Sequence, residues 1–298
     1  GDFFMRKKRF IIRVNEFLNR FLLLLLVPLF FTVFYQKMQI EEMSGSTGTG
    51  EMQLIGIVAK EIGAGAGEEL LKAQAVIART NLLAAQEAKT EEPEGFSQEE
   101  MRKLWGENFA QIYQRIENAV QETEGETLQY ENKWIYAAYH ALSAGTTRSM
   151  EELYPDAKMP YLCSVDCHED SSAKDYLQVF YWEKEEFLKK CSEAYPQAEV
   201  TDVSQIFVTA KDLAGYALKV QVGNESDTGE EFREKIGLPS SDFTIAIRDE
   251  KVRIVTKGQG HGFGLSQYTA EKMAERGTGY EEILNYFFPG AKLKRESE

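Results

Sequence analysis

GQGHGFGLSQYTAEKMAERGTGYEEILNYFFPGAKL, residues 258–293, is the most informative stretch of this sequence. Gly262 and Gly264 follow His261 at alternate positions, and a helix-like run begins near Ser266. Glycine adopts positive φ and has no Cβ, so it suits places where another group comes close to the backbone. Two interpretations stay open: a ligand lies along this backbone, or a neighbouring segment packs there in a structural hairpin with a satisfied histidine.

Helices dominate the first half of the chain that follows residue 50. Apolar residues within 68–86 recur at three- and four-residue spacing, which predicts an amphipathic helix. A second helical region begins at Ser97, which forms a capping-box pattern with Glu100 and leads to a run ending near residue 122. We expect this second region to form a helical insertion at about residues 95–130.

Strands dominate the later part of the chain. Alternating apolar residues predict strands within 203–223, and FTIAIRDEKVRIV at 243–255 has the pattern of a hairpin. Short helices are expected at 184–191 and 230–236. Helices and strands are segregated along the chain and do not alternate as in parallel units, so we predict an α+β fold of mixed helices and antiparallel strands.

The N-terminus predicts a membrane anchor. Residues 1–20 form a basic cytoplasmic tail, and residues 21–36 contain an uncharged apolar run that is expected to be one transmembrane helix. Residues 37–50 are polar and glycine-rich, as in a flexible linker, and residues 51–298 are expected to form one folded domain. A cleaved signal peptide is the alternative, but no small-residue cleavage site follows the apolar run. The domain is then extracytoplasmic, on a single-pass protein of the cell membrane.

The charge balance excludes one class of partner. The chain has a formal net charge of -14 at pH 7, although its first 35 residues are basic. A domain this acidic is a poor ligand for phosphate backbones, because neutralising phosphates requires clustered Lys and Arg. We therefore expect no nucleic acid among the partners.

Glu61 is the candidate acid of the chain. It stands between the apolar run LIGIVAK and a glycine-rich turn that leads into the helix at 68–86. A carboxyl group bounded by apolar residues is favoured in its neutral form and can then donate a proton as a general acid. The alternative without a catalytic role is a solvated glutamate at the end of a secondary-structure element.

Five stretches in order resemble one family, the stage II sporulation protein D family of spore-forming Firmicutes. They cover nearly the whole chain from residue 51 to residue 293. The stretches are LKAQAVIART at 71–80, YHALSAGTT at 139–147, MPYLCSVDCHED at 159–170, EKIGLPSSDFTI at 234–245 and the stretch quoted first. Two departures from the family pattern are an Ile62-Gly63 pair after the glutamate and Ala144 in place of a glycine.

The resemblance implies a membrane-anchored lytic transglycosylase that cleaves peptide-stripped peptidoglycan strands during sporulation engulfment, at the mother-cell membrane facing the septum. Glu61 matches the family's catalytic glutamate, and a single carboxyl acting as acid and then base would close a 1,6-anhydro-muramic ring. The implied partners are glycan strands, a stage II sporulation protein P-like amidase and a stage II sporulation protein M-like membrane protein. A catalytically weak module that binds glycan or partner proteins is the alternative.

The same resemblance implies a set of substrate-binding residues near the two ends of the domain. We expect the glycines around His261 to line a glycan groove, with hydrogen bonds from Ser266 and Gln267 and stacking by Tyr268. The complete expected set is His261, Gly262, Gly264, Ser266, Gln267, Tyr268, Ser143 and Thr147.

The cysteines raise a separate question about metal. The chain has 3 cysteines, too few for a disulfide framework. Cys163, Cys167 and His168 stand close to zinc-ligand spacing, and with His140 they form a candidate zinc site of the kind that some family members hold. The alternatives are a Cys163–Cys167 disulfide or free buried thiols.

Overall fold

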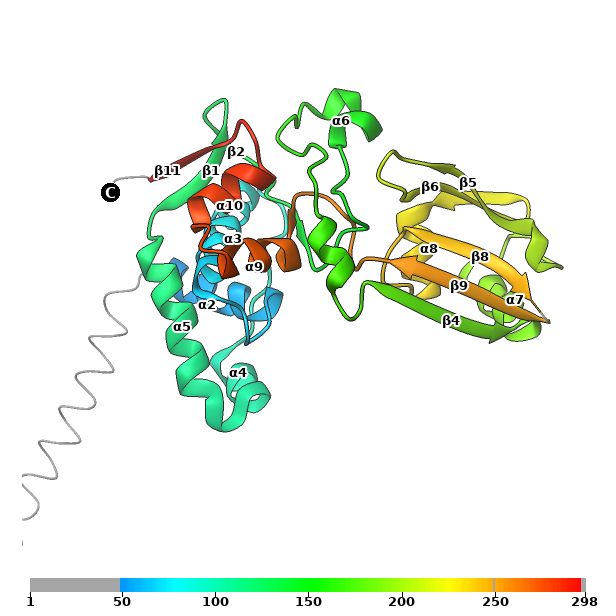
Figure 1. Ribbon diagram of the computed structural model, residues 1–298, viewed down its shortest axis with the longest axis horizontal. Coiled ribbons are helices and arrows are strands. Elements are labelled where there is room, and N and C mark those ends of the chain that lie inside the picture. Colours follow the sequence, from blue (N-terminus) through cyan, green and yellow to red (C-terminus); the bar gives the residue numbers. More distant parts are fainter. Residues whose placement is uncertain (1–48, 249, 296–298) are drawn as a thin grey trace, which may run out of the picture. The chain divides into compact units, whose positions relative to one another are not determined.

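The computed structural model describes residues 49–248 and 250–295 (Figure 1). The predicted tail at 1–20, the predicted anchor at 21–36 and most of the predicted linker lie outside the described residues. Within the described ranges, no helix combines the length and the apolar character needed to cross a membrane. The last two residues of the predicted linker already belong to the first described helix, which begins at Thr49.

The first of two hydrophobic cores lies in a helical lobe, residues 53–176 and 259–295. Helix α3 is its central element and contacts α5, α9 and α10 (Figure 1). All residues from Leu54 to Ala59 of α2 are buried, so this helix is apolar on every side. The helices are α2 (Thr49–Glu61), α3 (Glu68–Ala88), α4 (Gln98–Trp105), α5 (Phe109–Glu122), α6 (Met150–Leu153), α9 (Gln267–Glu275) and α10 (Tyr280–Phe287).

The predicted helical insertion is part of this core. The capping box of Ser97 and Glu100 is confirmed at the start of α4, and the short η1 (Gly106–Asn108) separates α4 from α5. Ile116 and Val120 of α5 are buried in the same apolar cluster as α3. The lobe's small strands are β1 (Glu126–Tyr130), β2 (Lys133–Trp134), β3 (Tyr139–His140), β10 (Leu265–Ser266) and β11 (Lys292–Arg295).

The second core lies in a β lobe, residues 177–258. Two antiparallel three-stranded sheets, β4-β9-β8 and β5-β6-β7, enclose it together with α7 and α8 (Figure 1). The predicted strands, hairpin and short helices are confirmed here, and with them the α+β class. The elements are β4 (Leu177–Glu183), α7 (Lys184–Ala194), β5 (Ile206–Lys211), β6 (Ala217–Val222), β7 (Glu225–Thr228), α8 (Gly229–Ile236), β8 (Phe243–Arg248) and β9 (Lys251–Lys257). Single-turn helices η2 (Pro155–Ala157), η3 (His168–Ser172) and η4 (Val203–Gln205) complete the described chain.

Arg148 joins the two lobes through a buried ion pair. Its side chain is 3 % exposed, and its Nε donates to Asp212 Oδ2 of the β lobe at 2.6 Å. Its Nη1 donates to Glu230 Oε1 at 3.1 Å and to the main-chain oxygen of His261 at 3.2 Å. The guanidinium also lies over the Phe263 ring, 4.7 Å from the centroid. The loop that carries His261 is therefore fixed by a residue that the β lobe holds in place.

Candidate active site

Glu61 ends helix α2 and is half-buried at the edge of the helical lobe. The turn after it is fixed from two sides, because Arg115 donates to the Ala64 and Ala66 oxygens and the Glu271 carboxylate accepts from Gly67 N at 2.9 Å. The Glu271 carboxylate also compensates the unpaired N–H groups at the start of α3.

A predicted binding residue fixes the main chain of Glu61. Gln267 Nε2 donates to the Glu61 main-chain oxygen at 3.0 Å, so the start of α9 holds the end of α2 in position. The glycine-rich turn that departs from the family pattern thus has a defined conformation, and the Glu61 carboxyl starts from a fixed backbone.

Three neighbouring cavities run past Glu61. The first, of about 750 Å³, and the second, of about 410 Å³, share Glu61 and Tyr139 as lining residues. The third, of about 490 Å³, shares Ala141, Gln259 and Gln267 with the second. Glu61 therefore stands where the first two cavities meet, with space for a chain-like ligand on both sides.

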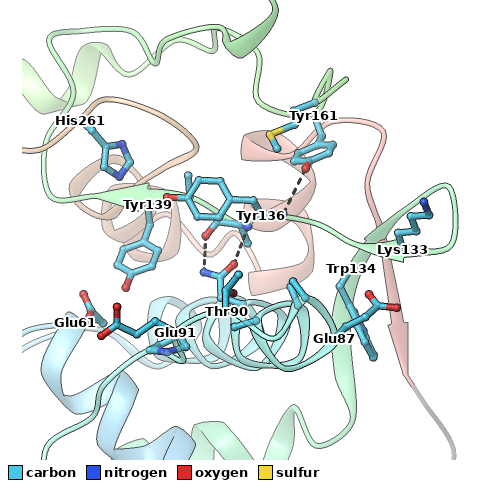
Figure 2. A pocket seen from close by; sticks show the side chains of 18 residues that line it. Glu61, Glu87, Thr90, Glu91, Lys133, Trp134, Tyr136, Tyr139, Tyr161 and His261 are labelled. Atoms are coloured by element: carbon cyan, nitrogen blue, oxygen red, sulfur yellow. Dashed lines mark hydrogen bonds between the residues drawn. The ribbon is translucent and has the colours of Figure 1, made fainter. Parts of the chain in front are cut away.

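Aromatic side chains line the first cavity (Figure 2). The rings are those of Trp134 at the end of β2, Tyr136 in the irregular segment 135–138, Tyr139 at the start of β3 and Tyr161 in the loop at 159–165. The Asn81 side chain of α3 fixes that segment by bonding both the N–H and the oxygen of Ala137 at 2.9 Å. Sugars bury their apolar faces against aromatic rings, so this wall suits a carbohydrate.

The hydroxyl of Tyr139 points toward the Glu61 carboxyl in Figure 2. Burial, together with the adjacent negative charge and hydrogen bond of Glu61, raises the pKa of Tyr139. The phenol therefore keeps its proton and can donate it as a hydrogen bond to the carboxylate. A hydrogen bond from a phenol to a carboxylate is charge-assisted and stronger than one between neutral groups.

Two histidine rings lie side by side in the site, with centroids 5.8 Å apart. His261 lines the first cavity and its Nδ1 accepts from Phe263 N at 3.1 Å, while burial lowers its pKa. His140 lines the second cavity, and burial is the main cause that lowers its pKa to about 3. Its Nδ1 lies 3.0 Å from the Phe263 oxygen and so carries the proton, which leaves Nε2 as a buried acceptor without a partner in the described chain.

The structure brings together some of the predicted binding residues. Glu61 and His261 share the first cavity, Glu61 and Gln267 share the second, and Tyr268 lines the third. The motifs from the two ends of the domain therefore converge on one groove.

Ser266, Ser143 and Thr147 have no exposed surface, which contradicts their prediction as ligand contacts. Ser266 Oγ donates to the buried Asp170 carboxylate at 2.8 Å and accepts from Thr269 N as the N-cap of α9. Ser143 N donates to the same carboxylate at 2.6 Å. Thr147 bonds the Cys163 oxygen and Val165 N, both at 2.9 Å. These side chains build the scaffold under the groove.

The glycines next to His261 meet the protein's own chain. A Cβ on Gly264 would lie 2.0 Å from the Ala138 oxygen, and one on Gly262 would lie 2.5 Å from the Tyr216 ring. Both glycines also have positive φ, 67° and 82°. The expectation that Gly262 and Gly264 contact a glycan is wrong, because neighbouring protein atoms occupy the space that the missing side chains leave.

The four predicted zinc ligands do not form a metal site. Across residues 49–248 and 250–295, no group of three or more His, Cys, Asp or Glu side chains could hold a metal ion. His168 is exposed and bonds Asp166 at 2.5 Å, whereas the buried His140 bonds Phe263. Cys163 and Cys167 are free thiols, and burial raises the pKa of Cys167 to about 12. The two cysteines therefore correspond to the free-thiol alternative.

Some site residues had no recognised signal in the sequence. Tyr139 and Tyr161 lie within the stretches that resemble the family, but their aromatic rings are equally typical of a core. Arg148 directly follows the stretch at 139–147 and Arg233 directly precedes the stretch at 234–245, but neither belongs to the residues by which those stretches resemble the family. Only the fold shows that Arg148 is buried and that Arg233 lines the second cavity.

Comparison with known proteins gives a consistent result. A family profile described as "Stage II sporulation protein" matches residues 49–130. The chain is 34 % identical over 257 residues to stage II sporulation protein D of Bacillus amyloliquefaciens, covering 82 % of this chain and 73 % of that protein. It is 31 % identical to the protein of the same name from Bacillus subtilis (strain 168), covering 82 % and 74 %.

A more distant relative bears a different name. The "Amidase enhancer" of Bacillus subtilis (strain 168) is 27 % identical over 290 residues, which cover 80 % of this chain and 40 % of that protein. The fold is thus an α+β domain with a half-buried carboxyl in an aromatic-lined groove. The chain belongs to the stage II sporulation protein D family.

Proposed function

We propose that the chain is a lytic transglycosylase that cleaves peptidoglycan glycan strands, with Glu61 as both general acid and general base. The observation that carries the proposal is the place of the Glu61 carboxyl, at the junction of two cavities, one of them walled by aromatic rings. A polymer bound across both cavities would present one glycosidic bond to this carboxyl.

The chemistry needs one carboxyl and no outside water. Glu61 donates its proton to the glycosidic oxygen as the bond from that oxygen to C1 of the muramic residue breaks. The resulting carboxylate takes the proton of the C6 hydroxyl of the same residue while O6 bonds to C1. The products are a free 4-hydroxyl and a 1,6-anhydro-muramic end, and Glu61 regains its proton. Tyr139 stabilises the carboxylate between the two proton transfers.

The biological setting belongs to the same proposal. The relatives named stage II sporulation protein D support a role in sporulation. The proposed place, at the engulfing membrane and outside the cytoplasm, rests on the basic and apolar pattern of residues 1–36. The relative named "Amidase enhancer" supports joint action with a peptidoglycan amidase, which we take to be stage II sporulation protein P-like. A stage II sporulation protein M-like membrane protein is the further partner proposed.

The test is Glu61→Gln, assayed on peptide-stripped glycan by mass spectrometry. Glutamine keeps the shape but has no proton to donate, so cleavage should fall by about 10²–10⁴-fold while circular dichroism stays unchanged. Glu87→Gln, at the far end of the first cavity, is the matched control (Figure 2). Reducing ends in place of anhydro ends would mean hydrolysis. Wild-type protein that binds glycan without cutting it would favour the binding-module alternative.

A further inference from the structure

The two cavities that meet at Glu61 carry opposite charges. The first is lined by Glu87 and Glu91 as well as Lys133, but Figure 2 shows Lys133 and Glu87 at the Trp134 end, away from Glu61. Next to Glu61, this cavity is therefore acidic because of Glu91. In the second cavity Arg233 is the only charged lining residue besides Glu61.

The acidic side is held in place by its neighbours. Glu92 accepts from Gln53 at 3.0 Å and Glu94 pairs with Lys60 at 3.0 Å, so the segment after α3 is fastened along α2. Glu91 has no hydrogen bond or ion pair within the described residues and is exposed to the cavity. Its charge is therefore free to act on a ligand.

The basic side is preorganised in a similar way. The Arg233 side chain is 19 % exposed, its Nε donates to Glu230 at 2.6 Å, and its Nη2 pairs with Glu234 at 3.4 Å. Glu230 is itself held by Arg148 and Ser241. Within the described chain, Arg233 Nη1 makes no hydrogen bond. The guanidinium is thus oriented by two carboxylates, and Nη1 is the nitrogen left to donate to a ligand in the second cavity.

The neutral His140 ring forms part of the wall of the second cavity. His140 is 4 % exposed and lines the second cavity with Arg233. Its Nε2 has no partner within the described chain but is closed off from solvent, so it is not a contact for the ligand. The charged group that the cavity offers to an anionic ligand is Arg233.

Peptidoglycan alternates two sugars, and only muramic acid carries a carboxyl group, on its 3-O-lactyl ether. That carboxylate is free only where the stem peptide has been removed. We propose that Arg233 binds the free lactyl carboxylate of a muramic residue in the second cavity, while Glu91 keeps carboxylates out of the first, which takes the uncharged glucosamine-type sugar. This inference rests on the proposed function. It also sets the direction in which the glycan strand lies across the two cavities.

Charge explains why an arginine suits this role. A hydrogen bond from a guanidinium to a carboxylate is charge-assisted and stronger than one between neutral groups. A muramic residue placed at Arg233 has its C1 bond to the next sugar at Glu61, between the two cavities. Recognition of the lactyl carboxylate by Arg233 would therefore determine both which substrate binds and which glycosidic bond is cleaved.

The experiment compares two substrates and matched variants. Peptide-stripped glycan is used with its lactyl carboxyls intact and after their chemical reduction to alcohols. Arg233→Gln should lower kcat/KM about 10- to 100-fold on the intact strands and leave the reduced strands unchanged. Arg233→Lys should restore part of the loss. Lys174→Gln, in the third cavity, is the control and should not discriminate between the substrates.

Binding to the Glu61→Gln variant separates this inference from the proposed function. In that background, Arg233→Gln should weaken binding of intact strands only, and Glu91→Gln should strengthen it about twofold. Equal losses on both substrates, or none on intact strands, would overturn the assignment of Arg233. Unchanged binding in Glu91→Gln would show that Glu91 does not keep carboxylates out of the first cavity. If the wild-type protein cleaves neither substrate, the transglycosylase proposal fails and these binding results still decide the charge recognition.

Discussion

The helical lobe and the β lobe are built around separate hydrophobic cores, yet they contribute unequally to the site. The helical lobe supplies Glu61, Tyr139 and the aromatic wall, and its sequence carries most of the recognisable motifs. The β lobe supplies Arg233 and Pro239 to the second cavity, and its sheets read as ordinary alternating strands. The difference shows that a lobe without obvious catalytic motifs can still form half of the groove.

The joint between the lobes gives the largest expected effect on stability. Arg148→Met should lower the free energy of unfolding by about 3–5 kcal/mol, because Asp212 and Glu230 would lose their buried partner. Urea unfolding followed by circular dichroism measures this. Lys184→Met, which breaks the exposed pair with Glu250, is the control and should cost at most about 1 kcal/mol.

A double variant keeps this prediction testable if Arg148→Met does not fold. Arg148→Met with Asp212→Leu removes both charges of the buried pair and should recover part of the lost stability. Equal losses in Arg148→Met and Lys184→Met would show that the lobes do not depend on this joint.

The next effect concerns chemistry within the helical lobe alone. Tyr139→Phe should lower kcat roughly 10- to 100-fold with little change in KM, since a hydrogen bond to a charged group contributes about 1.5–3 kcal/mol. Steady-state kinetics on peptide-stripped glycan measures it. Tyr268→Phe, in the third cavity, should leave kcat unchanged. A rise in KM with constant kcat would assign Tyr139 to substrate binding instead.

The smallest effect is a pH dependence of stability. The pKa of His140 is lowered to about 3, so the unfolded chain takes up this proton first as the pH falls below about 6.5. The protein should therefore lose stability from pH 6.5 to pH 5, and His140→Asn should reduce that slope by roughly 1 kcal/mol per pH unit. The pKa of His261 is also lowered, so part of the pH dependence of stability remains in this variant.

The exposed His168 provides the control for this titration. Its pairing with Asp166 raises its pKa, so its contribution to stability grows as the pH falls. His168→Asn should therefore steepen the loss of stability, opposite in sign to His140→Asn. The same change of slope in both variants would rule out the buried-histidine explanation.

Local pattern was enough to predict much of the fold. The helix at 68–86, the capping box at Ser97 and the hairpin at 243–255 follow from spacing that each segment carries by itself. Helix α2 was read only as an apolar run, because a helix buried on all sides has no amphipathic period. Strand β3 has a different cause: it has only two residues and forms through its parallel pairing with β10.

For the candidate site, the sequence indicated which segments come together, but not which of their side chains packing would bury. Glu61 and Gln267 line the second cavity, and their roles stay predictions. Ser266 and Ser143 do not line this cavity, because Asp170, far away in sequence, turns them into buried hydrogen-bond donors. The partner of a hydroxyl group is set by the fold, so a motif that contains serine cannot tell a scaffold from a contact.

The crossing between the lobes has a consequence for recombination and protein engineering. The chain enters the β lobe after Tyr176 and leaves it at Gly258, and these two residues are hydrogen-bonded to each other at 2.8 Å. The two ends of the β lobe thus already meet, so a short linker could replace the lobe without a break in the chain. Its removal would nevertheless leave the buried Arg148 without its acidic partners. A transplanted lobe has to bring equivalents of Asp212 and Glu230 with it, so this pair sets which lobes can be exchanged.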